Sequence, residues 1–209
     1  MSRKRSSSSA RWIAEHEADE YVREARKLGY RSRAVFKLLE INQRDRVLKP
    51  GQVVVDLGAA PGGWSQVARP LLGANGTLIA LDILPMETMD GVDVLTGDFR
   101  EASVLEALEA RLQGKPVDLV MSDMAPNVSG ISAADQAGQL YLCELAQDFC
   151  AHHLKPGGDF LVKVFQGEGF EAYLKNLRQS FESVLIRKPK ASRARSREVY
   201  LLARRLRPV

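Results

Sequence analysis

Short apolar runs that alternate with helical segments are the feature that most constrains how this chain folds. The β-branched run at 53–55 predicts a buried strand that ends at Asp56, and helical residues follow over 63–72. The same alternation predicts further strands over 77–81, 92–95, 117–121 and 160–165, two last strands over 183–187 and 199–203, and helices over 101–112, 133–154 and 169–181. Such alternation is typical of an α/β protein with a doubly wound, mainly parallel sheet.

The length of the chain bounds its domain organisation. With 209 residues it has the size of one domain, and it shows no internal repeat and no second core. Residues 1–10 are rich in Ser, Arg and Lys, so we expect a mobile tail there and a single domain over 11–209. Helix-favouring residues over 12–28, and a second helix capped by Ser32, predict a helical appendage over 11–49.

Composition excludes several classes of protein. Hydrophobic residues make up 45% and charged residues 27%, which is ordinary globular usage and excludes a disordered or fibrous chain. No apolar run approaches the ~18 residues of a membrane span, and the basic start lacks the hydrophobic stretch of a secretory signal. The three histidines, at 16, 152 and 153, lack metal-ligand spacing. We therefore expect a cytoplasmic protein without membrane or metal, and we take it to be a monomer.

Charge is segregated along the chain. Residues 1–50 hold 13 Lys and Arg against 7 Asp and Glu, residues 51–183 hold 8 against 18, and residues 184–209 hold 9 against 1. A solvated surface would explain one basic segment, but two basic ends brought together by the fold would form one positive face that attracts phosphate backbones. Charge alone does not distinguish RNA from DNA. The candidate phosphate contacts are Arg31, Arg33, Arg193, Arg195 and Arg197.

A glycine-rich turn, DLGAAPGGW, directly follows the first predicted strand. Glycine lets the backbone pass close to a ligand, and the helix that follows offers free N–H groups. The chain lacks the G-x-G-x-x-G spacing, which counts against a dinucleotide pyrophosphate on this turn. A tight turn that only needs glycine is the alternative, but three glycines with a proline and flanking acids favour a ligand. The candidate ligand-binding residues here are Asp56, Gly58, Gly62 and Gly63.

Four aspartates follow four successive strands: Asp56, Asp82, Asp98 and Asp123. The carboxyl ends of parallel strands share one rim, where ligands of such sheets bind. Asp82 comes about as far after Gly58 as the acid that reaches a ribose in nucleotide-binding sheets. Acids also cap helices and end strands, but four in register favour a nucleoside-bearing, cationic or polar ligand.

Lys163 is the unexpected residue of the strand 160–165, which is otherwise apolar. Lysine is rarely buried unless it is paired, and a lysine at a strand edge reaching solvent is the alternative. If it is buried, desolvation would lower its pKa from the reference value of ~10.4, as a lysine acting as a base requires. Lys37 and Glu198 are ordinary surface charges unless the fold brings them to Lys163.

Long motifs along the chain resemble those of the bacterial FtsJ/RrmJ-type 23S ribosomal RNA 2′-O-methyltransferases. The motifs are DLGAAPGGWSQ (56–66), LDILPM (81–86), GDFR (97–100), SDMAPNVSG (122–130), VKVFQGEGF (162–170), SRARSREVYLLA (192–203) and the opening RSRAVFKLLEI (31–41). The resemblance runs from about residue 8 to 203. It implies a class I, Rossmann-like methyltransferase fold with seven strands, of which the last is antiparallel.

The resemblance also implies an activity and its residues. The cofactor is S-adenosylmethionine, and the target is the ribose 2′-hydroxyl of a uridine in the A loop of 23S ribosomal RNA, methylated on the large ribosomal subunit. The implied catalytic residues are Lys37, Asp123, Lys163 and Glu198. The implied cofactor contacts are Gly62, Trp64, Asp82, Asp98 and Asp123.

The implied mechanism is an in-line displacement in which the 2′-oxygen attacks the methyl group of a sulfonium. Lys163 would remove the hydroxyl proton, and like-charge repulsion from Lys37 would keep Lys163 partly neutral. Asp123 and Glu198 would orient the two lysines. In the alternative version Lys163 stays protonated and only orients the hydroxyl.

Three other functions remain open from the sequence. A nicotinamide-dependent oxidoreductase is disfavoured by the glycine spacing and by the basic ends. A non-catalytic RNA-binding assembly factor is disfavoured by the presence of all four catalytic residues. Methylation of another RNA, such as a tRNA or a cap, is not distinguished, because target choice depends on surface shape.

Overall fold

The structure is a computed structural model, and it describes residues 19–127, 129–130, 132–193 and 196–208. The expected tail at 1–10, the first part of the expected helix at 12–28, and Arg195 lie outside these residues. No helix of the described part is long and apolar enough to cross a membrane.

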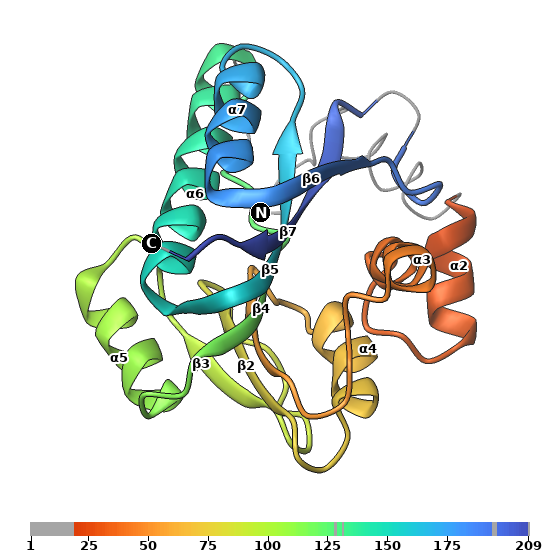
Figure 1. Cartoon of the computed structure of the whole chain (residues 1–209). Helices are drawn as coiled ribbons and strands as arrows, with labels where there is room; N and C mark the ends of the chain where they lie inside the picture. Colours follow the sequence, from red (N-terminus) through yellow and green to blue (C-terminus); the bar gives the residue numbers. More distant parts are fainter. Residues whose placement is uncertain (1–18, 128, 131, 194–195, 209) are drawn as a thin grey trace, which may run out of the picture.

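The predicted alternation of strands and helices is confirmed (Figure 1). The helices are α2 (Glu20–Lys27), α3 (Val35–Asp45), α4 (Gly63–Leu72), α5 (Ala102–Leu112), α6 (Ser132–His153) and α7 (Phe170–Ser180). The strands are β1 (Val53–Leu57), β2 (Thr77–Asp82), β3 (Asp93–Thr96), β4 (Val117–Ser122), β5 (Leu154–Phe165), β6 (Phe181–Arg187) and β7 (Glu198–Leu206).

The seven described strands form one sheet in the order β3-β2-β1-β4-β5-β7-β6. The pairs from β3 to β5 are parallel, whereas β7 runs antiparallel to both β5 and β6. The expected seven-stranded sheet with an antiparallel last strand is therefore confirmed. The chain order reverses between β1 and β4, and such a switch point is where ligands of doubly wound sheets bind.

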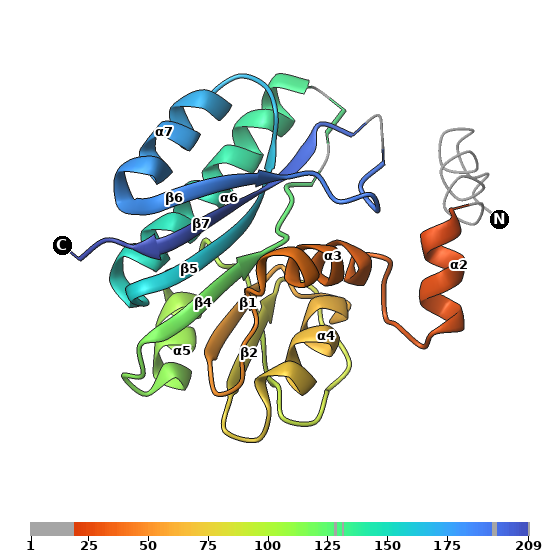
Figure 2. The ribbon, with the colours of Figure 1, turned by 45° about the vertical axis from the view of Figure 1, so that its right-hand side comes forward.

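Helices cover both faces of the sheet (Figure 2). Successive strand residues point to opposite faces, so Val54 packs with α3 and α4 while Val55 packs with α5, α6 and α7. The leading helices differ from the expected appendage, because α3 buries Val35, Leu38 and Ile41 in the core with α4. Helix α2 lies outside α3, farther from the sheet (Figure 1).

Some boundaries differ from those expected. Helix α3 starts after Ala34 without a side-chain cap, so the predicted capping role of Ser32 is wrong. Strand β5 starts earlier than predicted because Leu154 pairs with Val117, before a shift in register aligns Asp159 with Leu119. Gly157 and Gly158, which lie between Leu154 and Asp159, do not end the pairing of β5 with β4.

Candidate active site

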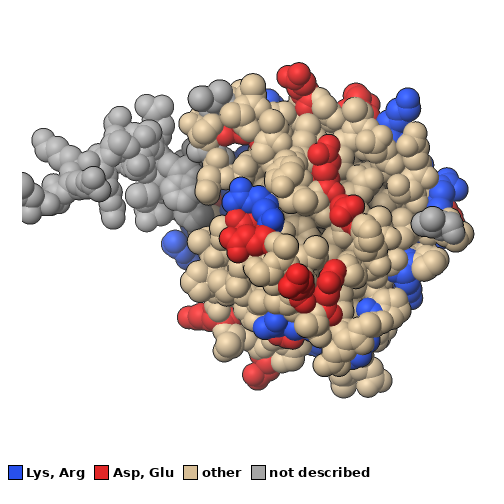
Figure 3. All heavy atoms as spheres, turned by 90° about the vertical axis from the view of Figure 1, so that its left-hand side faces the viewer, with Lys and Arg blue, Asp and Glu red and all other residues tan. Residues whose placement is uncertain are grey.

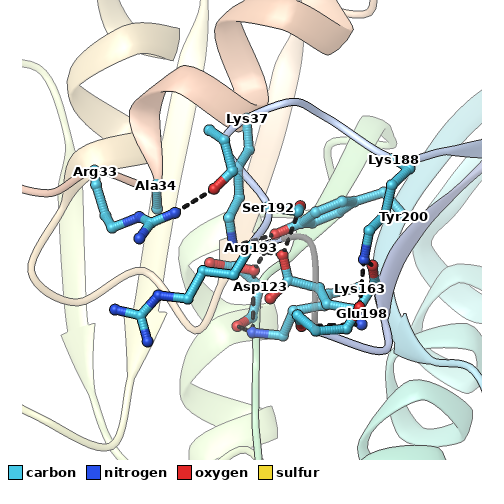
Figure 4. A network of polar contacts seen from close by, with 12 residues as sticks. Arg33, Ala34, Lys37, Asp123, Lys163, Lys188, Ser192, Arg193, Glu198 and Tyr200 are labelled. Carbon is cyan, nitrogen blue, oxygen red and sulfur yellow. Dashed lines mark hydrogen bonds and ion pairs between the residues drawn. The ribbon is translucent and has the colours of Figure 1, made fainter. Parts of the chain in front are cut away.

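The site lies where the carboxyl ends of β1, β4 and β5 meet helix α3 and the loop between β6 and β7 (Figure 4). Lys163 stands on β5, and strand alternation directs it to the same face as Leu161, toward α3. Lys163 is only 6% exposed, so of the two alternatives, a buried lysine and an edge lysine that reaches solvent, the structure has the buried one. A buried ammonium needs a partner, and the partner is supplied by the end of β4.

Asp123 follows β4 directly and faces Lys163. Lys163 Nζ lies 3.1 Å from Asp123 Oδ1 and also donates to the Asp123 backbone oxygen. Burial acts to raise the pKa of Asp123, but Lys163, Lys37 and a hydrogen bond from Tyr200 outweigh it and hold this pKa below its ordinary value. The carboxylate is therefore ionised at neutral pH and fixes the Lys163 side chain.

Lys37 and Glu198 form a second ion pair beside the first. Lys37 on α3 places its Nζ 2.6 Å from Glu198 Oε1, at the start of β7, and both side chains are largely buried. Ser192, in the loop before β7, donates from its hydroxyl to the same Glu198 oxygen at 3.0 Å. The four residues predicted as a catalytic set thus lie in one cluster, although they come from four separate segments.

Tyr200 joins the two ion pairs, and the sequence analysis missed it. Its hydroxyl donates to Asp123 Oδ1 at 2.7 Å and accepts from Lys37 Nζ at 3.2 Å. Tyr200 is fully buried, and burial with the charges of Asp123 and Glu198 raises its pKa well above the ordinary value, so it stays a neutral donor. The signal that could have found it is strand alternation, since Tyr200 lies two residues after Glu198 and therefore on the same face.

The glycine turn lies next to this cluster and is shaped by packing within the protein. At Gly58 (φ +77°) a Cβ would lie 2.7 Å from the backbone nitrogen of Met124, and at Gly62 (φ +102°) it would lie 2.8 Å from an Arg31 nitrogen. At Gly63 it would lie 2.4 Å from the hydroxyl of Ser32. The glycines therefore bring the turn against the end of β4 and against the loop before α3.

Trp64 is buried beneath the turn. Its indole Nε1 donates to the backbone oxygen of Ala34 at 2.9 Å, and its ring lies 5.6 Å from that of Tyr200. The side chain thus ties α4 to α3 and backs the ring of Tyr200. Trp64 is the second residue of α4, directly after the glycines of the turn.

Asp82 braces the turn from the end of β2. Its two carboxylate oxygens accept from the backbone N–H groups of Ala60, at 2.9 Å, and Leu84, at 2.8 Å. Each oxygen has a second lone pair that can accept from a further donor. The next two side chains, Ile83 and Leu84, are 57% and 62% exposed although they are large and apolar.

Asp56 and Asp98 have opposite environments. Asp56 is fully buried and accepts from the hydroxyl of Ser65 at 2.7 Å, while its other oxygen has no partner among the described residues. Burial raises the pKa of Asp56 to about 7, against the Ser65 hydrogen bond and with help from Asp123 and Asp82. Asp98 lies at the rim, where hydrogen bonds from Arg100 lower its pKa.

The candidate phosphate contacts differ in what they already bind. Arg31 donates to the backbone oxygens of Pro61, Glu87 and Thr88, so it braces the glycine turn. Arg33 and Arg193 both pair with the carboxylate of Asp19, and Arg197 is exposed. The two basic ends of the chain therefore meet beside the lysine cluster.

The face covered by α5 and α6 carries acidic and basic side chains in small groups, some of them adjoining, on a largely uncharged surface (Figure 3). Among the described residues, no group of three or more His, Cys, Asp and Glu is placed to hold a metal ion.

Comparison with known proteins assigns the family. The sequence model of the FtsJ-like methyltransferases matches residues 30–206. The chain is 59% identical to "Ribosomal RNA large subunit methyltransferase E" of Alkalilimnicola ehrlichii, with 97% of each chain covered, and 61% identical to the protein of that name from Azoarcus sp., covering 95% of this chain and 97% of that one.

Solved structures agree on the fold. A Plasmodium falciparum protein described as a ribosomal RNA methyltransferase superposes with a TM-score of 0.77 at 27% identity, over 85% of this chain and 98% of that one. Aeropyrum pernix fibrillarin, solved with S-adenosyl-L-methionine bound, shares the fold alone, with a TM-score of 0.57 at 15% identity, over 81% of this chain and 75% of that one. This chain belongs to the FtsJ-like methyltransferase family.

Proposed function

We propose that this protein transfers a methyl group from S-adenosylmethionine to a ribose 2′-hydroxyl of large-subunit ribosomal RNA, at a uridine of the 23S A loop. The observation that carries the proposal is the cluster of Lys163, Asp123, Tyr200, Lys37 and Glu198 beside the glycine turn. Two relatives, whose sequences are 59% and 61% identical to this chain, are named as ribosomal RNA large subunit methyltransferases. This name supplies the class of RNA.

The residues of the turn fit this cofactor. Asp82 has two carboxylate oxygens that each keep a free lone pair, as hydrogen bonds from the hydroxyls of a ribose require. The exposed side chains of Ile83 and Leu84 offer apolar surface to a flat ring such as adenine. We assign Gly62, Trp64, Asp82, Asp98 and Asp123 as cofactor contacts, and Asp56, Gly58 and Gly63 as residues that shape the turn from beneath.

The chain's own residues then have two tasks. The cofactor supplies a methyl group on a sulfonium, so the protein has to align the 2′-oxygen and dispose of its proton. Lys163 Nζ contacts Asp123 at the end of β4, and we assign it to this proton: as a neutral amine it would accept the proton, and as an ammonium it would only orient the hydroxyl. Asp123 and Tyr200 keep its side chain in one position.

Lys37 supplies a second positive charge to the same cluster. Together with Lys163 it holds the pKa of Asp123 below its ordinary value. Glu198 and Tyr200 hold Lys37 in place, at 2.6 Å and 3.2 Å from its Nζ. If Lys163 instead stays protonated and only orients the hydroxyl, the single-turnover rate will show no rising limb with pH that belongs to a lysine.

RNA would approach over the basic loop between β6 and β7. Arg33 and Arg193 meet at Asp19 beside this loop, and Arg197 is exposed within it; we propose these three, with Arg195, as contacts to RNA phosphates. We also propose Arg31 as a contact to RNA on this surface, although its guanidinium already donates to three backbone oxygens. The protein would act as a monomer, in the cytoplasm, on the large ribosomal subunit.

A methyl-transfer assay tests the proposal. The purified protein is incubated with S-adenosylmethionine carrying a labelled methyl group and with large ribosomal subunits from cells that lack the enzyme. We expect label in 23S RNA, mapped by primer extension to one 2′-O-methylated nucleotide, and no label in subunits from cells that contain the enzyme. Failure to bind the donor or to label the subunits would refute the function, and label on tRNA alone would change the substrate.

A further inference from the structure

A pocket of about 450 Å³ lies beside the lysine cluster, between α2 and the loop that joins β6 to β7. Four cationic side chains line it, two from the start of the chain and two from its end. They are Arg23, Arg33, Lys190 and Arg193. Positive side chains gathered in one pocket repel one another unless an anion lies between them.

Two carboxylates also line the pocket, those of Asp19 and Glu20, and the one that pairs with two of the arginines is Asp19. Its Oδ2 pairs with Arg33 and lies 3.6 Å from Nε of Arg193, while its Oδ1 accepts from the backbone N–H of Tyr21 at 3.0 Å. The Asp19 side chain is only 10% exposed, and that of Arg33 only 16%. Asp19 thus holds a place between two arginines where the oxygens of a phosphate would also be bound.

The pocket is connected to the catalytic cluster through its wall. Ser192 lines the pocket and donates to Glu198, which in turn pairs with Lys37. Arg33 and Arg193 lie beside Lys37 (Figure 4). An RNA strand whose ribose reaches Lys163 would therefore place a neighbouring phosphate close to Arg33 and Arg193.

We propose that this pocket binds a backbone phosphate of the RNA next to the methylated nucleotide, and that the phosphate displaces the Asp19 carboxylate from Arg33 and Arg193. Asp19 is then a competitor built into the chain. It keeps the arginines paired when no RNA is bound and weakens the binding of any RNA that cannot replace it. The inference rests on the proposed function, because it places the phosphate relative to the methylated ribose.

The test is the substitution Asp19→Asn, which removes the charge. Asparagine keeps the oxygen that accepts from the N–H of Tyr21, and it caps helices as well as aspartate does. We expect the variant to bind unmethylated large subunits, and also a short unrelated RNA, about three- to tenfold more tightly, with a salt slope steeper by about one. Glu24→Gln, which removes the same charge from an exposed position on α2, should have a much smaller effect.

A second substitution identifies where the gain arises. In the Asp19→Asn background, Arg193→Gln should abolish the tighter binding, because the two changes act on one contact and are not additive. If Asp19→Asn leaves RNA affinity unchanged or lowers it, Asp19 only holds the arginines in place and the inference is wrong. If the unsubstituted protein binds no ribosomal RNA at all, it is the proposed function that fails.

Discussion

Lys163 and Tyr200 are register partners across β5 and β7, and both side chains end on one carboxylate oxygen of Asp123. Because β7 runs antiparallel to β5, the two residues lie directly opposite each other and share the face that carries α3. A lysine and a tyrosine from strands that are far apart in sequence are thereby fixed on the same acid.

This relationship predicts the effect of Tyr200→Phe. The ring still fills the core, but Asp123 loses a donor and Lys37 an acceptor. We expect the single-turnover rate of methyl transfer to fall about ten- to a hundredfold, since one lost charge-assisted hydrogen bond is worth ~1.5–3 kcal/mol. The pH dependence of the rate should shift as well, while the affinity for S-adenosylmethionine stays close to that of the wild type.

Tyr173→Phe is the matched control. Tyr173 is also buried, and its hydroxyl donates to the backbone oxygen of Cys143 at 3.0 Å on the opposite face of the sheet. It should lower the stability by an amount similar to Tyr200→Phe but leave the rate unchanged. Equal rates in the two variants would show that Tyr200 has only a structural role.

Lys163→Ala tests the group that is assigned to the proton. Without the ammonium no basic group lies next to Asp123 on β5, so we expect turnover to fall at least a hundredfold. Binding of S-adenosylmethionine, measured by isothermal titration, should remain near normal. The control Lys155→Ala removes an exposed lysine from the same strand, and activity of Lys163→Ala within a few-fold of the wild type would contradict the assignment.

Strand and helix order could be predicted from the sequence because it depends on local residue patterns. The β-branched run of β1 and the odd lysine of β5 are visible without any knowledge of the fold. Strand alternation places Tyr200 on the same face as Glu198, but the residues that its hydroxyl contacts cannot be predicted in this way. Its role depends on the register of an antiparallel pair, which is decided by contacts between residues distant in the sequence.

Side-chain direction also escaped the sequence analysis. Arg31 and Arg33 look equivalent in the sequence, yet Arg31 binds backbone oxygens near the glycine turn and Arg33 pairs with Asp19. Asp56 ends a predicted strand like Asp82, but it is in register with Ala80, two residues before Asp82, so it is buried within the sheet while Asp82 lies at the rim. The position of an acid in the sequence thus predicts its strand end, and the packing around it decides what it can contact.

Asp82→Asn is predicted to weaken cofactor binding. The amide keeps the size of the side chain but loses the charge and one acceptor, so hydrogen bonds to ribose hydroxyls become weaker. We expect the dissociation constant for S-adenosylmethionine to rise about ten- to a hundredfold in isothermal titration. Asp93→Asn, at an exposed position on β3, serves as the control, and an equal effect of both substitutions would remove Asp82 from the cofactor site.

Neutralising the basic loop should change how RNA binding responds to salt. Replacing Arg193, Arg195 and Arg197 together by glutamine removes up to three phosphate contacts, so we expect weaker binding of large subunits and a salt slope lower by up to about three. Replacement of Lys115, Lys175 and Arg178, which are exposed on the side of α5 and α7, is the matched control. A slope that stays unchanged in the first variant would remove this loop from the RNA surface.

Asp56 predicts a pH-dependent contribution to stability. Its pKa is about 7 in the folded protein and 3.8 when unperturbed, so the folded state binds the proton more tightly. A carboxyl with a raised pKa stabilises the fold fully below its unfolded pKa, and this contribution is lost as the pH rises through about 7. The free energy of unfolding falls by about 4 kcal/mol between the unfolded pKa of 3.8 and the folded pKa of about 7.

Asp56→Asn isolates this contribution, because asparagine stays neutral and can still accept from the hydroxyl of Ser65. We expect the free energy of unfolding of the wild type to fall, relative to the variant, as the pH rises from about 4 to about 7, and to change little above pH 7, in denaturant titrations. The comparison cancels every other titrating group, since both proteins share them. Parallel stability curves would mean that Asp56 ionises normally, with its second oxygen bound to a donor instead of buried without one.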